Sequence, residues 1–147
     1  MAPSPESILF ESLFFKWAQA NCESFEIDEE QMLIEEGVAT PDLFLLLEGF
    51  AKVRTAIENG NTSMDSVDLA EIGPGQFAGE MSLLEDRLPV ATVIALPKSR
   101  WIRVRYSDLL KTFENDKALA SSTYQVFASK LALQLSSQNA FIHRWPG

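Results

Sequence analysis

The sequence predicts a mainly β protein with flanking helices: a double-stranded β-helix of the jelly-roll-like β-roll type, with an N-terminal helix and a long C-terminal helix. Short strand-like segments recur between residues 25 and 104 and are separated by turns rich in glycine and proline. Apolar residues at helical spacing precede these segments. After them, the stretch from Lys117 to Asn139 contains neither glycine nor proline, which favours one long helix.

The length and composition indicate one globular domain. A chain of 147 residues can bury one core and is short for two domains. Its 46% hydrophobic and 22% charged residues are typical of a folded chain. We therefore expect a single domain over residues 1–147, with an N-terminal helix (1–23), a β-roll (24–106) and C-terminal helices (107–142).

The first predicted element is a helix over residues 5–20, with Ser7 as a candidate N-cap. The next two strands are predicted on either side of the acidic turn at residues 28–30. Further strands follow at 43–49, 50–57 and 67–72, with a hairpin turn at 58–61. The last two strands are predicted at 92–95 and 101–104, and Ser107 is a candidate cap for a short helix ending at Phe113. His143 falls in the predicted tail.

Three features of the sequence bear on the cellular location of the protein. No apolar run approaches the roughly 20 residues of a membrane span, and the N-terminus lacks the basic region of a secretory signal. Cys22 is the single cysteine, so an internal disulfide is excluded and a cytoplasmic setting is favoured.

The charge pattern argues against direct binding of nucleic acid. The net charge is −9, and the densest basic group is Arg100, Arg103 and Arg105. Strand alternation puts Arg103 and Arg105 on one face, beside which we identify no aromatic-rich groove. An anionic small ligand is still compatible with this charge, because the local field of a pocket matters more than net charge.

No catalytic or metal constellation is recognisable. The single histidine, His143, has no nucleophile or ligand partner at a suggestive spacing, and Cys22 has no activating neighbour. The acids at 28–30 and at 35 and 36 are expected to form a solvated acidic surface. We therefore expect a protein that is not an enzyme.

The most informative segment runs from Phe77 to Leu84 and is followed by Ala91-Thr92-Val93. It predicts a strand end, a short helix led by Gly79, and a return strand. Such a turn leaves backbone N–H groups free to bind an anion, usually a phosphate. Glu80 stands at its mouth, where a carboxylate can accept from sugar hydroxyls.

This segment closely resembles the phosphate-binding cassette of cyclic nucleotide-binding domains, here residues 77–93. The resemblance extends over roughly Ser24 to Asn139, with local support from residues 45–53 and 72–77. It implies a sensor of cAMP, cGMP or another nucleotide-like anion. The ligand-binding residues that it implies are Gly79, Glu80, Met81, Ser82, Arg87, Pro89, Val90, Ala91 and Thr92.

The arginine with which the family binds the cyclic phosphate is missing from the cassette. Pro89 or Val90 stands in its place, depending on which branch of the family gives the spacing. Loss of one charge-assisted contact, about 1.5–3 kcal/mol, weakens binding roughly ten- to hundred-fold. Arg87 is two residues away from Pro89 and is either a substitute or a surface partner of Glu85 and Asp86.

Structural roles compete with these binding roles. Glu80 can serve only to cap its own helix, and Gly79 can be required only by the backbone geometry. Thr92 can be simply a strand residue.

The long helix carries two apolar series. Tyr124, Phe127, Leu131 and Leu135 form a face that can pack on the roll, whereas Leu119, Val126 and Leu133 are seven apart and fit a seam with a partner helix. In the family this helix is both a lid and a dimerisation element; the alternative is a helix that packs only on its own domain.

Two functions follow. The first is a cytoplasmic regulatory module that binds a nucleotide-like ligand and signals through the C-terminal helix to a protein partner or a homodimer. The second is a non-binding interaction scaffold for dimerisation or docking. The family's bacterial activators continue into a DNA-binding domain, which is not present in this sequence, so the chain is either free-standing or a fragment.

Overall fold

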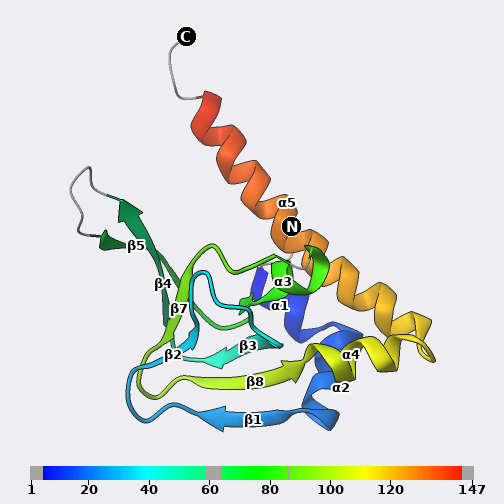
Figure 1. The fold of residues 1–147 in the computed structure, drawn as a ribbon. Helices are drawn as coiled ribbons and strands as arrows, with labels where there is room; N and C mark the ends of the chain where they lie inside the picture. The colour runs from blue at the N-terminus through cyan, green and yellow to red at the C-terminus, as the bar shows by residue number, and fades with distance from the viewer. Residues whose placement is uncertain (1–4, 59–63, 86, 144–147) are drawn as a thin grey trace.

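Two antiparallel sheets of four strands form a β-roll, with helices at both ends of the chain, as Figure 1 shows. The computed structural model describes residues 5–58, 64–85 and 87–143. The strand order is β1-β8-β3-β6 in one sheet and β2-β7-β4-β5 in the other. The predicted fold class is thereby confirmed. The strands are β1 (Glu23–Glu26), β2 (Gln31–Ile34), β3 (Asp42–Glu48), β4 (Ala51–Glu58), β5 (Met64–Ile72), β6 (Phe77–Ala78), β7 (Thr92–Ala95) and β8 (Arg100–Arg105).

The strand predictions agree with the structure to within a few residues, and part of the hairpin turn at 58–61 lies outside the described residues. Successive side chains of β3 divide the core because they point to opposite faces of the sheet. Leu43 and Leu45 pack with the helices, whereas Phe44 and Leu46 pack inside the roll against Trp101.

The N-terminal helix predicted over residues 5–20 is in fact two helices, α1 (Pro5–Phe10) and α2 (Leu13–Asn21). Ser12 causes the break. Its hydroxyl accepts from the backbone N–H of Phe15 (3.0 Å) and donates to the carbonyl of Leu9 (2.6 Å). It therefore caps the second helix, as serine does at helix starts.

The cassette helix α3 spans Glu80–Glu85, and two helices follow the roll: α4 (Tyr106–Phe113) and α5 (Lys117–His143). The prediction that Ser107 caps α4 was wrong. The helix already begins at Tyr106. Arg105 therefore occupies the N-cap position, without a side-chain hydrogen bond. His143, placed in the tail by sequence, is the last residue of α5. Among the described residues no helix is long and apolar enough to cross a membrane.

The side of α5 that packs on the domain only partly matches the predicted one, because Phe127 is buried as expected but Tyr124 is not. Leu119, Val126 and Phe127 are buried against α1 and α2, whereas Tyr124 and Leu133 are 45% and 44% exposed. Leu119 and Val126 therefore cannot belong to the predicted partner seam. Leu131 is half-buried, and the side chain of Leu135 lies outside the described residues.

Candidate functional site

Gly79 has a backbone conformation and surroundings that only glycine fits. Its φ is +104°, and an added Cβ would lie 2.7 Å from the carbonyl oxygen of Asp42 and 2.9 Å from the hydroxyl of Tyr106. The Tyr106 hydroxyl donates to the carbonyl of Gly79 and thereby ties β8 and α4 to the cassette. Burial, with the nearby Glu80 charge, raises the pKa of Tyr106, so this hydroxyl stays protonated and able to donate.

Glu80 follows at the start of α3 and is buried, with 4% of its surface exposed. Its carboxylate is paired with Lys130 of α5, with 2.6 Å between Oε1 and Nζ. Lys130 also donates to the carbonyl of Phe77 (2.7 Å) and lies 4.8 Å from the centre of the Phe77 ring. A role only as a cap explains the place of Glu80 in the first turn of α3, but it does not explain this ion pair.

The other residues of the predicted cassette helix are less enclosed. Met81 is exposed and Ser82 is half-buried, while Leu83 packs against the helical core. The helix thus has one anchored apolar side and one open side. Gly79, with its positive φ, leads directly into the first turn of this helix.

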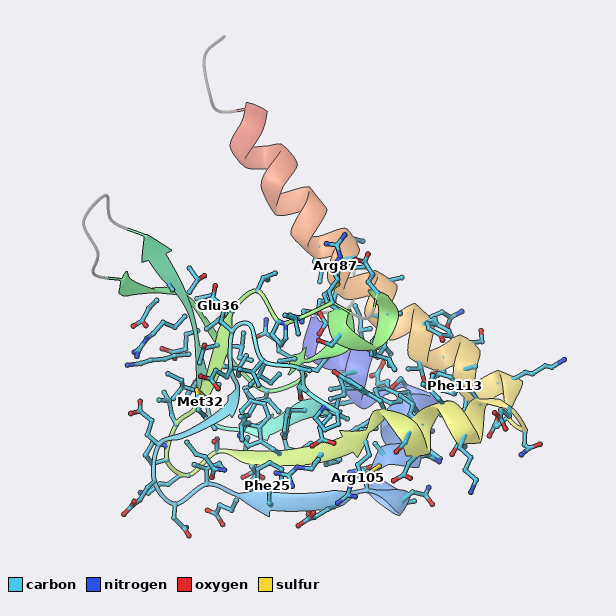
Figure 2. The ribbon with its side chains drawn as sticks, in the orientation of Figure 1. Phe25, Met32, Glu36, Arg87, Arg105 and Phe113 are labelled. Carbon is cyan, nitrogen blue, oxygen red and sulfur yellow. The ribbon has the colours of Figure 1, made fainter. Side chains whose placement is uncertain are left out.

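Arg87 is paired at the surface, which is one of the two alternatives for it. Its Nε lies 2.6 Å from Oε2 of Glu85, and the two side chains are 68% and 44% exposed. Figure 2 shows Arg87 beside α3 on the outside of the molecule. Of the two residues at the position of the missing arginine, Val90 is exposed, and the carbonyl of Pro89 accepts from Gly37 N–H (2.9 Å).

Thr92 begins β7, and its hydroxyl accepts from the backbone N–H of Glu36 (3.0 Å). The neighbouring Ala91 is half-buried. Glu36 was expected to be a solvated acid, and this was wrong. Its carboxylate accepts from the hydroxyl of Thr55 (3.0 Å) and from the backbone N–H of Ala56 (2.8 Å). The end of β2 is therefore held to β4 and β7 by side-chain contacts.

Lys130 is the cassette contact that sequence reasoning missed. A signal for it exists in the helical spacing, because Lys130 continues the side of α5 marked by Leu119, Val126 and Phe127. A lysine at the end of a buried stripe indicates a cation aimed at the domain. Its partner comes from a segment 50 residues away, which spacing within one helix cannot identify.

Cys22 and the acidic residues provide no competing site. Burial and the nearby charge of Asp108 raise the pKa of the Cys22 thiol to about 11, so the nucleophilic thiolate is scarce at neutral pH. Within residues 5–58, 64–85 and 87–143 there is no group of three or more residues suited to hold a metal ion.

Solved structures of other proteins share this fold. A cyclic nucleotide-binding domain from Methylobacillus flagellatus KT superposes with a TM-score of 0.77 at 17% identity, over 97% of this chain and 83% of that chain. The catabolite activator protein of Thermus thermophilus gives 0.69 at 20% identity, over 94% of this chain and 63% of that chain. The chain thus spans less than two thirds of the Thermus protein. A third structure, of cAMP-bound PfPKA-R (141–441), gives 0.59 at 18% identity, over 73% of this chain and 39% of that chain.

At these identities the structural likeness establishes the fold, and the sequence match establishes the family. Residues 24–116 match the family described as the cyclic nucleotide-binding domain. The matched segment contains almost all of the roll, Gly79 with its positive φ, and Glu80 at the start of α3. The chain therefore belongs to the cyclic nucleotide-binding domain family.

Proposed function

We propose that this protein is a cytoplasmic regulatory module that senses a nucleotide-like anion, with cAMP and cGMP as the first candidates, and that it reports occupancy through α5. Membership of the family supports a regulatory role rather than an enzymatic one. The contact between Glu80 and Lys130 carries the proposal, because it joins the cassette to the C-terminal helix.

The charge balance of the cassette explains how the site works without its arginine. A cyclic phosphate placed at the first turn of α3 approaches the buried carboxylate of Glu80. Two negative groups in a partly buried site need a cation between them. Lys130 already contacts Glu80. Its three N–H donors allow it to maintain this ion pair while it donates a hydrogen bond to the ligand.

The same contact explains how occupancy would be transmitted. Breaking a buried ion pair by removing one partner costs about 3–5 kcal/mol, because the remaining charge is left uncompensated. A ligand bound in the cassette that accepts a hydrogen bond from Lys130 adds a second contact between the cassette and α5. It therefore strengthens the attachment of this helix. Occupancy then shifts α5 toward the docked position, where a partner protein or a second copy of the chain can detect it.

Isothermal titration calorimetry with cAMP and with cGMP tests the proposal. We expect micromolar binding by the wild type, and affinity at least tenfold lower in Glu80→Gln and in Lys130→Met. Lys117→Met is the matched control, because Lys117 lies exposed on the same helix. Absence of heat from the wild type up to millimolar ligand would overturn the proposal. Loss of binding in Arg87→Gln but not in Lys130→Met would assign the cationic role to Arg87.

A second candidate function is supported by the exposed apolar side chains on the C-terminal helices. Leu110 of α4 and Tyr124 and Leu133 of α5 are 44–46% exposed. They favour a dimerisation or docking scaffold that needs no ligand. Light scattering at several protein concentrations distinguishes the two, because a scaffold of this kind dimerises equally with and without cyclic nucleotide.

A further inference from the structure

A cavity of about 380 Å³ opens where the segment from β2 to the start of β3 meets β8, and Asp42 in its wall also lies next to Gly79 of the cassette. It is lined by residues 32–35 of β2 and the turn after it, by residues 38–42, and by Phe44 and Arg103. None of these residues belongs to the cassette. Figure 2 labels Met32, which lies on β2 and lines this cavity. Its walls combine apolar side chains with the polar side chains of Glu35, Thr40, Asp42 and Arg103.

Arg103 is the unusual residue of this cavity. Its guanidinium lies 5.2 Å from the ring centre of Phe25 and 5.6 Å from that of Phe44. The sequence-based expectation that no aromatic groove adjoins this arginine was therefore wrong, because the two rings come from strands distant in sequence. Contacts with both rings hold the cation in place without using its N–H donors.

The hydrogen bonds of Arg103 are incomplete. Its Nε lies 3.7 Å from Oδ2 of Asp42, which is too long for a hydrogen bond, and it is buried with no partner among the described residues. The two side chains are 33% and 18% exposed, so other atoms of both can be reached from the cavity. A donor and an acceptor therefore lie side by side in a cavity whose lining is both polar and apolar.

The charged residues of the lining sum to one negative charge, which disfavours an anion, and Arg103 opposes a cation placed beside it. Arg103 contributes one positive charge, and Asp42 and Glu35 each contribute one negative charge. An anion that approached Arg103 would meet Asp42, and a cation that approached Asp42 would meet Arg103. A neutral group with an acceptor and a donor on the same edge satisfies both residues without adding charge. An amide has this arrangement.

We propose that this cavity binds a small, neutral, planar molecule with an amide edge, such as an aromatic amide or a lactam. The carbonyl of the ligand accepts from the Arg103 guanidinium, and its N–H donates to the carboxylate of Asp42. Its ring packs against Leu33, Val38 and Phe44, which line the same hollow. This site borders the cassette at Asp42 and Phe44, but the proposal does not rest on nucleotide binding.

Three isosteric probes test the proposal by charge alone: benzamide is neutral, benzoate is an anion and benzamidine is a cation. Binding to the full chain is followed in ¹H–¹⁵N correlation spectra, with side-chain Nε–H signals included. We expect benzamide to shift the signals of residues 38–44 and 103 with a Kd on the order of 1–10 mM, as fits so small a ligand. We expect benzoate and benzamidine to bind at least tenfold more weakly. Equal or tighter binding of benzoate, or no shift with millimolar benzamide, would overturn the proposal.

Variants separate recognition from folding. Arg103→Met is expected to weaken benzamide at least tenfold, while Arg105→Met, a change on the same strand outside the cavity lining, leaves it unchanged. If Arg103→Met fails to fold, Arg103→Lys keeps the charge but loses the planar fork and serves the same purpose. Asp42→Asn removes one negative charge, so the preference is expected to move toward benzoate. Equal benzamide binding in the Arg103 and Arg105 variants would also overturn the proposal.

Discussion

Gly79 shows how closely the structural and binding roles of one residue overlap in this cassette. Positive φ is required for the turn, and the space where a side chain would begin is taken by Asp42 and Tyr106. The competing explanations for Gly79, backbone geometry and approach of a phosphate, therefore need not exclude each other. The structure establishes the first, and the second belongs to the proposal.

Replacing Gly79 with alanine is expected to destabilise the fold strongly. The left-handed backbone costs about 1–2 kcal/mol for a residue with a Cβ, and overpacking adds about 1–3 kcal/mol. Gly37→Ala is the matched control, because Gly37 also has positive φ (+78°) but no atom within 4 Å of the added Cβ. Urea unfolding measures both variants. Equal losses of unfolding free energy would show that the cassette backbone moves to accept the methyl group.

The thiol of Cys22 is expected to react slowly at neutral pH. Its pKa in the folded protein is raised to about 11, from an ordinary value of 9.0, mainly by burial. The folded state therefore keeps its proton at a pH where the unfolded chain has lost it. Stability from this group is present below pH 9 and is lost as the pH rises toward 11.

Iodoacetamide labelling followed by mass spectrometry checks this expectation. The rate for the native protein should still be rising near pH 10, whereas the rate in denaturant should level off earlier. A native profile that matches the denatured one would contradict the assigned burial.

At the scale of elements, α5 is defined by what it packs against. Leu119, Val126 and Phe127 face α1 and α2, and the Phe127 ring lies 6.0 Å from that of Phe14. Lys130 extends the same side to the cassette. One side of a single helix thus contacts both the N-terminal helices and the candidate site.

Two leucines on α5 are expected to differ sharply when truncated. Leu119→Ala should lower the unfolding free energy by about 2–5 kcal/mol, because it leaves a cavity in the helical core. Leu133→Ala should change it by no more than about 0.5 kcal/mol in the isolated chain, because the side chain is exposed. Thermal or urea unfolding of the monomer measures both. A large loss in Leu133→Ala that depends on protein concentration would instead indicate that Leu133 lies in a dimer interface.

The elements were predictable where their signals are local. Turn residues and alternating apolar positions located the strands, and the Gly79-Glu80 pair located the start of α3. The break at Ser12 was missed because a serine is compatible with a continuous helix until its hydroxyl finds a backbone partner. The packing side of α5 was only partly predicted, because apolar spacing allowed more than one side and the choice depends on α1 and α2.

At the scale of the whole molecule, the candidate sites were predictable in proportion to how continuous they are in sequence. The proposed cassette residues lie within one short segment, 77–93, and could be named from the sequence. Lys130, and the group formed by Phe25, Asp42, Phe44 and Arg103, are assembled from separate segments. Strand order brings the four residues of that group together, because β8 lies between β1 and β3.

Binding at the cassette is expected to stabilise the entire domain. A ligand that binds only the folded state at 100 times its Kd adds about 2.7 kcal/mol to the unfolding free energy. Differential scanning fluorimetry with cAMP should therefore raise the Tm of the wild type and leave that of Glu80→Gln unchanged. A Tm increase of equal size in Glu80→Gln would place the ligand elsewhere on the protein.

Lys130 lies near the middle of α5, so a small tilt of the helix at this residue would move its C-terminal end by a larger distance. Figure 1 shows the final turns of α5 extending beyond the rest of the fold. Thirteen residues separate Lys130 from His143, a length of about 20 Å at the rise of an α-helix. A tilt of about 10° around Lys130 would move the far end by roughly 3 Å over that length. A change of bonding partners at one lysine is thus magnified into a displacement large enough to disrupt a close-packed contact at the helix tip.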